Sequence, residues 1–209
     1  MDQVERFGII GSGIIGAGWA GRALSVGMDV YAFDPEPGAE SRLKKKLDQI
    51  WPVLERTGVF PDASKDRLVF CESVEAVAAQ SDFIQESAPE RIDLKVELHA
   101  QIDAAASPDV VIASSTSGLL PTDFQAQCKH PERVIVGHPF NPVYLLPLVE
   151  VLGGKKTSLE NIDRAVMFYK SIGMYPLKVR SEVPGFLSDR LQEALWREIL
   201  HLVNDDVAT

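Results

Sequence analysis

The stretch that decides the fold reads Phe7-Gly8-Ile9-Ile10-Gly11-Ser12-Gly13-Ile14-Ile15-Gly16, near the start of a chain of 209 residues. Its first half is an apolar run, which predicts a buried strand, and its second half predicts a helix. Gly11 permits a tight turn, Gly13 lets a bound group approach the backbone, and Gly16 permits close packing of the helix on the strand. The stretch therefore predicts a strand, a glycine-rich turn and a helix.

These three glycines have the spacing of the dinucleotide-binding fingerprint, in the strand-turn-helix context that it requires. Asp34 ends the next apolar run, where the fingerprint places a carboxylate for the adenosine ribose. Residues 35–38 contain no arginine that would receive a 2′-phosphate, so NAD is favoured over NADP. No metal ion is expected. The alternative is a plain turn followed by a surface aspartate. The predicted NAD-binding residues are Gly11, Ser12, Gly13, Ile14, Ile15, Gly16 and Asp34.

Strand-like and helix-like segments alternate along most of the chain, which predicts an α/β fold with a doubly wound, mostly parallel sheet of the Rossmann type. Several strand-like runs lack polar alternation, as expected for strands covered on both faces. The expected strands are residues 6–10, 29–33, 68–71, 83–86, 110–113, 133–137, 148–151 and 175–179. The expected helices are residues 14–26, 40–56, 74–79, 94–105, 159–171 and 186–203.

A Pro-Gly pair at residues 184–185 separates two predicted units, a NAD-binding unit at 1–183 and the first helix of an all-helical unit at 184–209. That helix places Leu187, Leu195 and Leu202 near a period of 3.6 residues. A single amphipathic helix has nowhere to bury such a stripe. We expect the stripe to dock on a second copy of the chain or on further helices of a longer protein.

The composition excludes several classes of function. A net charge of −9 argues against nucleic acid and against anionic membrane surfaces as partners. Cys71 and Cys128 are the only cysteines, which favours free thiols in a reducing compartment. The chain shows neither a cleavable leader nor a long apolar run, so we expect a cytoplasmic protein.

Three polar residues predict proton chemistry beside the dinucleotide. His138 follows the expected strand 133–137, at the edge where open α/β sheets bind ligands, and histidine suits the removal of a hydroxyl proton. Glu150, near the end of the next strand, is expected to accept from the imidazole and stabilise the imidazolium. Ser117 is expected to hydrogen-bond the substrate oxygen. Together these residues predict dehydrogenation of an alcohol by hydride transfer.

Throughout its length the chain resembles the NAD-dependent 3-hydroxyacyl-CoA dehydrogenase family, including the motif Pro184-Gly185-Phe186. The resemblance implies catalytic roles for Ser117, His138 and Glu150. It also implies cofactor contacts for Glu90 and Lys95. Members of that family carry a C-terminal helical domain that completes the substrate pocket and forms a homodimer.

Residues 137–151, 86–91 and 193–198 more closely resemble the branch of this family that oxidises L-carnitine to 3-dehydrocarnitine. A trimethylammonium group donates no hydrogen bond, so aromatic faces and negative potential must hold it. The candidate substrate residues are Phe140, Asn141, Tyr144, Phe186, Asp189 and Trp196, where Asp189 replaces an asparagine of the family. The alternatives are oxidation of a 3-hydroxyacyl-CoA and a non-catalytic, NADH-binding structural role like that of a lens crystallin.

Overall fold

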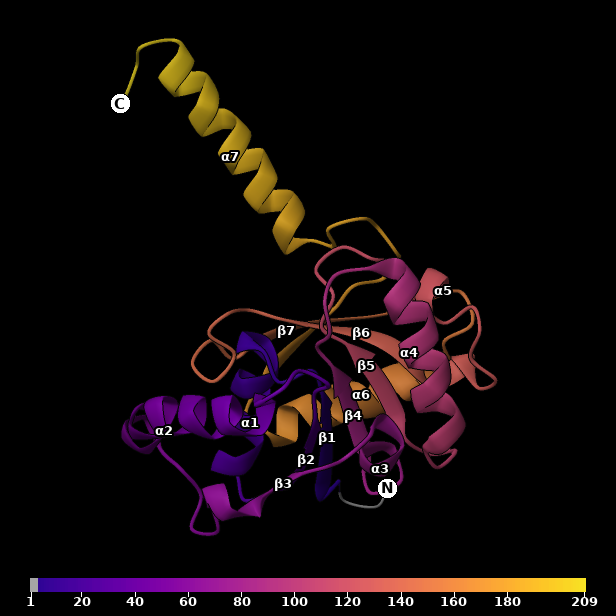
Figure 1. Cartoon of the computed structure of the whole chain (residues 1–209). Helices are drawn as coiled ribbons and strands as arrows, with labels where there is room; N and C mark the ends of the chain where they lie inside the picture. Colours follow the sequence, from indigo (N-terminus) through magenta and orange to yellow (C-terminus); the bar gives the residue numbers. More distant parts are fainter. Residues whose placement is uncertain (1–3) are drawn as a thin grey trace.

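The computed structural model describes residues 4–209 as a sheet of eight strands flanked by helices (Figure 1). The strand order is β3-β2-β1-β4-β5-β6-β7-β8. All neighbouring strands pair in parallel except β6 and β7, which are antiparallel. The strands are β1 (Arg6–Ile10), β2 (Asp29–Phe33), β3 (Leu68–Phe70), β4 (Phe83–Glu86), β5 (Val111–Ser114), β6 (Val134–Pro139), β7 (Leu148–Gly153) and β8 (Tyr175–Lys178).

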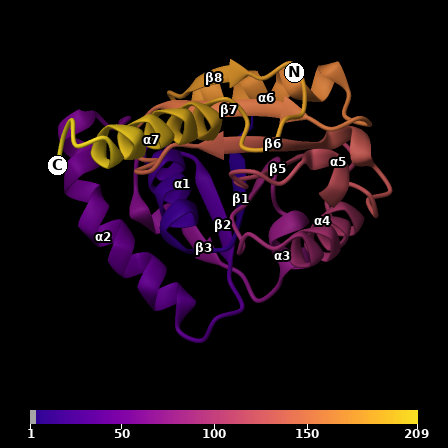
Figure 2. The ribbon, with the colours of Figure 1, turned by 90° about the horizontal axis from the view of Figure 1, so that it is seen from above.

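Helices cover both faces of this sheet, with α1 and α2 on the side of β1 opposite to α3 and α4 (Figure 2). The helices are α1 (Ile14–Ser25), α2 (Ala39–Thr57), α3 (Val74–Ala78), α4 (Ile92–Ala105), α5 (Pro121–Phe124), α6 (Leu159–Ser171) and α7 (Ser188–Asn204). The predicted α/β class is confirmed, and each expected strand and helix is present, most with ends shifted by one or two residues. Helix α5 was not expected from the sequence, because a single turn is too short to show a helical period.

Two apolar cores, one on each face, hold the sheet between its helices. On the first face, aromatic rings of the sheet and of α6 pack together, and the ring centroids of Phe83 and Phe168 lie 3.9 Å apart. On the second face, α3, α4 and α5 supply Val77, Ile102 and Phe124. Because both faces are covered, the central strands are buried throughout and show no regular alternation of apolar and polar residues.

The strand order reverses beside β1, which pairs with β2 on one side and with β4 on the other. Chains that leave the carboxyl ends of β1 and β4 therefore diverge, and such a switch point opens a crevice for a ligand. The glycine-rich turn follows β1 at this point. The fold thus places the predicted dinucleotide turn in the ligand-binding crevice.

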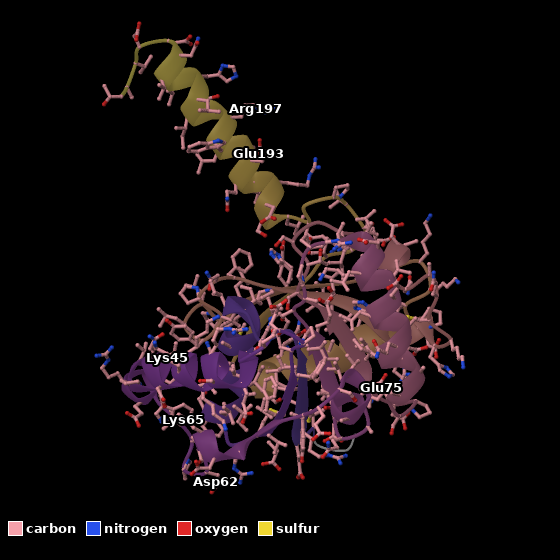
Figure 3. All side chains as sticks on the ribbon, in the orientation of Figure 1. Lys45, Asp62, Lys65, Glu75, Glu193 and Arg197 are labelled. Atoms are coloured by element: carbon pink, nitrogen blue, oxygen red, sulfur yellow. The ribbon has the colours of Figure 1, made fainter. Side chains whose placement is uncertain are left out.

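Helix α7 extends away from the sheet, and none of its residues is buried (Figure 1). Figure 3 shows Glu193 and Arg197 on the part of α7 that projects beyond the sheet and its helices. The exposed apolar side chains of this helix are Leu191, Leu195, Trp196, Ile199, Leu200, Leu202 and Val203. No helix among residues 4–209 is long and apolar enough to cross a membrane.

Candidate active site

The glycine turn after β1 is held by close backbone contacts. Gly11 adopts φ +92°, and a Cβ there would lie 2.6 Å from the backbone carbonyl of Ser87. A Cβ on Gly16 would lie 1.9 Å from the carbonyl oxygen of Gly11. A Cβ on Gly13, by contrast, would have no other atom within 4 Å. Gly11 and Gly16 therefore pack the turn, and Gly13 keeps its outer face open.

This open face fits a dinucleotide pyrophosphate. Gly13 is the N-cap residue of α1, no acidic residue lies in the first turn of that helix, and Ile14 is 67% exposed. A helix N-terminus with free N–H groups and no acidic residue in its own first turn attracts phosphate. The residues present therefore suit the cofactor that the fingerprint predicts.

Asp34 lies directly beside the turn. Its Oδ2 accepts hydrogen bonds from the backbone N–H and the hydroxyl of Ser12, at 2.7 and 3.0 Å, and its Oδ1 accepts from the N–H of Glu36 at 3.0 Å. These bonds fix the carboxylate at the end of β2. Its predicted contact with the ribose stays a prediction, for which this placement is suitable.

His138 and Glu150 face each other across the one antiparallel strand pair within residues 4–209. They are directly opposite in the register of β6 and β7, and Nδ1 of His138 lies 2.9 Å from Oε2 of Glu150. His138 is 7% exposed and Glu150 is fully buried. The apolar run in the sequence predicts that His138 follows its strand. The structure corrects this, because pairing with β7 extends β6 as far as Pro139.

Glu150 also accepts three hydrogen bonds from the start of α7. The N–H groups of Leu187 and Ser188 donate to its Oε1 at 3.0 Å each, and the Ser188 hydroxyl donates to Oε2 at 2.7 Å. Burial raises the pKa of Glu150, but the hydrogen bonds from His138, Ser188 and the backbone outweigh it and hold that pKa below its ordinary value. The contact of Ser188 with Glu150 was not predicted from the sequence. The one available signal was that Ser188 comes directly after the Pro-Gly-Phe-Leu segment.

Two of the candidate aromatic residues contact the His138 ring. The ring centroids of Phe140 and Phe186 each lie 5.6 Å from that of His138. Phe186 is fully buried and has φ 47°, a left-handed conformation that is unusual outside glycine. The structure thus places Phe140 and Phe186 next to His138, and their contact with substrate stays a prediction.

The other candidate substrate residues are spread more widely. Tyr144 lines a separate pocket of about 260 Å³ that also includes Arg22, and Asn141 is exposed in the loop between β6 and β7. Asp189 lines an open groove of about 500 Å³ along the start of α7. Trp196 is 54% exposed farther along that helix. The structure does not gather these four residues around His138.

Glu90 holds the loop that carries Ser117. Its Oε1 accepts from the N–H groups of Ser117 and Gly118 at 3.1 and 3.3 Å, and from the hydroxyl of Thr116. Ser117 itself is exposed. A Cβ on Gly118 would lie 3.7 Å from the backbone nitrogen of Gly185, so this loop approaches the turn that precedes α7.

Lys95 is buried in an ion pair that the sequence did not predict. Its ammonium donates to both oxygens of Glu86, at 2.7 and 2.9 Å, and to the carbonyl of Ala88 at 3.2 Å. Glu90 is 3.8 Å away. The three hydrogen bonds use all three N–H donors of the ammonium. The contact of Lys95 with the cofactor stays a prediction. The sequence signal that could have predicted this ion pair is the presence of two polar residues, Gln85 and Glu86, at the end of a strand that begins with apolar residues.

Gln85 connects β6 to neighbouring parts of the sheet and to α6. Its amide nitrogen donates to the Ser115 hydroxyl at 2.8 Å and to the carbonyl of Gly137 at 3.1 Å, while Tyr169 donates to its amide oxygen at 2.6 Å. A Cβ on Gly137 would lie 1.8 Å from the Tyr169 hydroxyl. Only glycine therefore allows this contact directly before His138.

Known proteins match this chain along its length. L-carnitine dehydrogenase of Pseudomonas putida is 60% identical over all 209 residues, and that of Streptomyces coelicolor is 49% identical over 208 residues. The chain spans 65% of the length of each of these relatives.

Solved structures share the fold. A 5-formyl-3-hydroxy-2-methylpyridine 4-carboxylic acid 5-dehydrogenase, described as an NAD⁺-dependent dismutase, superposes with a TM-score of 0.92 at 33% identity, over 99% of this chain and 67% of that one. The 3-hydroxybutyryl-CoA dehydrogenase of Escherichia coli K12 gives a TM-score of 0.90 at 29% identity, over 99% of this chain and 44% of that one.

The family model for the NAD-binding domain of 3-hydroxyacyl-CoA dehydrogenase matches residues 6–183. This range includes both the glycine turn and the His138–Glu150 pair. The chain therefore belongs to the 3-hydroxyacyl-CoA dehydrogenase family and carries its NAD-binding domain.

Proposed function

We propose that the protein oxidises the 3-hydroxyl of L-carnitine to a ketone with NAD as hydride acceptor. The observation that carries this proposal is the buried His138–Glu150 pair, 2.9 Å apart, on the same sheet as an open dinucleotide turn. The relatives named L-carnitine dehydrogenase, 60% identical over the whole chain in the case of Pseudomonas putida, supply the substrate. The two together support a secondary alcohol as the group that reacts.

In the proposed reaction the substrate loses a hydride from C3 and a proton from its hydroxyl. NAD supplies the hydride acceptor when it is bound. Glu150, held ionised, accepts from Nδ1–H of His138, which leaves Nε2 of that ring as the proton acceptor. Ser117 orients the hydroxyl through its own exposed side chain, on the loop that Glu90 holds. The products are the ketone, NADH and a protonated His138.

The proposed NAD contacts are the turn residues 11–16, Asp34 and Glu90. Asp34 accepts hydrogen bonds from the ribose hydroxyls. Glu90 lies at the nicotinamide end and holds the Ser117 loop there by hydrogen bonds. Lys95 supports that end by holding Glu86 in place. The cofactor would thus extend from the end of β2 to the loop after β5.

The trimethylammonium group of carnitine requires aromatic faces and negative potential. Phe140 and Phe186, both in contact with the His138 ring, are the proposed faces. Asp189, which lines the groove along α7, supplies negative charge in place of the family's asparagine. Tyr144 and Trp196 have weaker support, since one lines another pocket and the other is exposed on α7.

Following NADH absorbance in the full-length protein tests this proposal. We expect reduction of NAD with L-carnitine and much less with 3-hydroxybutyryl-CoA. Turnover of the CoA ester alone would replace carnitine by an acyl-CoA substrate. Binding of NADH without oxidation of either compound would instead favour the structural, crystallin-like role.

Homodimerisation and a cytoplasmic location belong to the same proposal. The exposed apolar stripe of α7 supports a partner for that helix, since apolar patches of several hundred Å² are uncommon on monomers. Cys71 and Cys128 are both free thiols, as suits a reducing compartment. Light scattering of the full-length protein checks the dimer, which a single monomeric species would exclude.

A further inference from the structure

Ser188 is the first residue of α7, and its side chain bonds outside that helix. The N-cap position before it is Leu187, whose apolar side chain makes no cap hydrogen bond. The Ser188 hydroxyl donates to Oε2 of Glu150 at 2.7 Å. It therefore serves the carboxylate of another element rather than its own helix.

That carboxylate oxygen is the one that His138 uses. Oε2 of Glu150 lies 2.9 Å from Nδ1 of His138, while the other oxygen, Oε1, takes the N–H groups of Leu187 and Ser188. The Ser188 hydroxyl and the imidazole thus share a single acceptor atom. A hydroxyl that donates to this oxygen withdraws negative charge that would otherwise stabilise the imidazolium.

The surroundings leave few other charges that act on Glu150. His138 is the titratable partner on β6, and the register partner of Glu150 on β8 is the apolar Leu177. On α7, Asp189 and Arg190 follow Ser188 with opposite charges, and within residues 4–209 neither bonds to Glu150. Among the described residues, the neutral donors to Glu150 are therefore the Ser188 hydroxyl, on Oε2, and the N–H groups of Leu187 and Ser188, on Oε1.

We propose that Ser188 is a positioning residue that acts through Glu150 to set the pH range in which His138 accepts a proton. Its hydroxyl and Nδ1 of His138 share Oε2, so this oxygen does not act on the imidazole alone. The start of α7 is thereby part of the proton-handling pair. This inference rests on the proposed function, in which His138 is the base.

Replacement of Ser188 by alanine tests the contribution of its hydroxyl alone. Ser188→Ala removes the bond to Oε2 but keeps the backbone N–H groups of Leu187 and Ser188 that hold Oε1, so Glu150 stays in place. The acid limb of the kcat/KM profile should then move up by about half a pH unit, since hydrogen bonding to the charged form shifts titration. Ser188→Thr, which restores a hydroxyl, should return the limb to its original position. Gln192→Ala, an exposed change on the same helix, is the matched control and should not move it.

Nuclear magnetic resonance of the His138 ring gives a readout that needs no turnover. The full-length protein and its variants are titrated, with His138→Gln used to assign the signal, and the midpoint should rise in Ser188→Ala and recover in Ser188→Thr. An unchanged midpoint in Ser188→Ala, or an equal shift in Gln192→Ala, would overturn the role of Ser188. Failure to oxidise any 3-hydroxy acid would refute the proposed function instead, while the ring titration would still decide the coupling.

Discussion

The glycine turn after β1 and the His138–Glu150 pair both fix polar groups in place, but they do so in opposite ways. The turn is a contiguous stretch in which Gly11 and Gly16 bring the backbone into contact with itself. The pair joins residues 12 positions apart through strand register, and Ser188 reaches Glu150 from 38 positions away. The first region tolerates almost no added atom at its packed positions. The second depends on hydrogen bonds that single substitutions remove one at a time.

The largest effect is expected in the turn. Gly16→Ala places a Cβ 1.9 Å from the carbonyl oxygen of Gly11, which α1 can relieve only by moving off β1. Overpacking of this kind costs about 3 kcal/mol of unfolding free energy, and NAD binding should be lost with the turn. Urea unfolding and NAD titration measure both effects.

Gly13→Ala is the matched control for that substitution, since no atom lies within 4 Å of its Cβ position. Stability should stay close to that of the unchanged protein, while NAD should bind more weakly because the added methyl group would face the pyrophosphate at its proposed position. Equal stability of the Gly13→Ala and Gly16→Ala variants would show that the turn is not closely packed.

The next effect concerns His138, the proposed base. His138→Gln should lower kcat for L-carnitine by ~10²–10⁴-fold, the usual range for loss of general-base catalysis, with little change in NAD affinity. His130→Gln is the control, because His130 is exposed and makes no contact with the pair. Equal activity of the two variants would remove His138 from the mechanism.

A smaller effect is expected from Asp34→Ala. The change removes the proposed ribose acceptor and also releases the N–H of Ser12, which bonds to Asp34 at 2.7 Å. Loss of a hydrogen bond to a charged group costs about 1.5 kcal/mol, or roughly tenfold in affinity. NAD should therefore bind about tenfold more weakly, and the preference for NAD over NADP should fall. Fluorescence titration with both cofactors checks this, and an unchanged preference would contradict the ribose contact.

The smallest effect concerns the pH dependence of stability. The pKa of Glu150 is held below its ordinary value of 4.5, so its ionised form stabilises the folded state. This contribution is fully present above pH 4.5 and is lost as the pH falls through the lowered value. Glu150→Gln should thus cost about 1 kcal/mol at about pH 7, the scale of one net hydrogen bond, and less at about pH 3. Denaturant unfolding at both pH values tests this, and a deficit that grew on acidification would reverse the assigned direction.

The predictions from sequence were accurate where the signal was local. The strands 6–10, 29–33 and 83–86 have the predicted ends, because apolar runs between turn residues define them. The predicted end of β6 was wrong, since its last residues are ordered by pairing with β7. Ser188 and the Glu86–Lys95 pair were missed, because neither lies in a periodic pattern or a motif spacing that sequence alone reveals.

The sequence by itself determined the α/β class and the glycine turn, and it predicted that His138 and Glu150 form a pair. It did so because steric limits on glycine and apolar periodicity act over a few neighbouring residues. Only the tertiary structure decided that His138 and Glu150 are direct register partners. It also decided that Glu90 accepts a hydrogen bond from the Ser117 loop, and that the first N–H group of α7 donates to Glu150. Those contacts join distant segments, and their geometry depends on sheet order and antiparallel pairing, which no local pattern encodes.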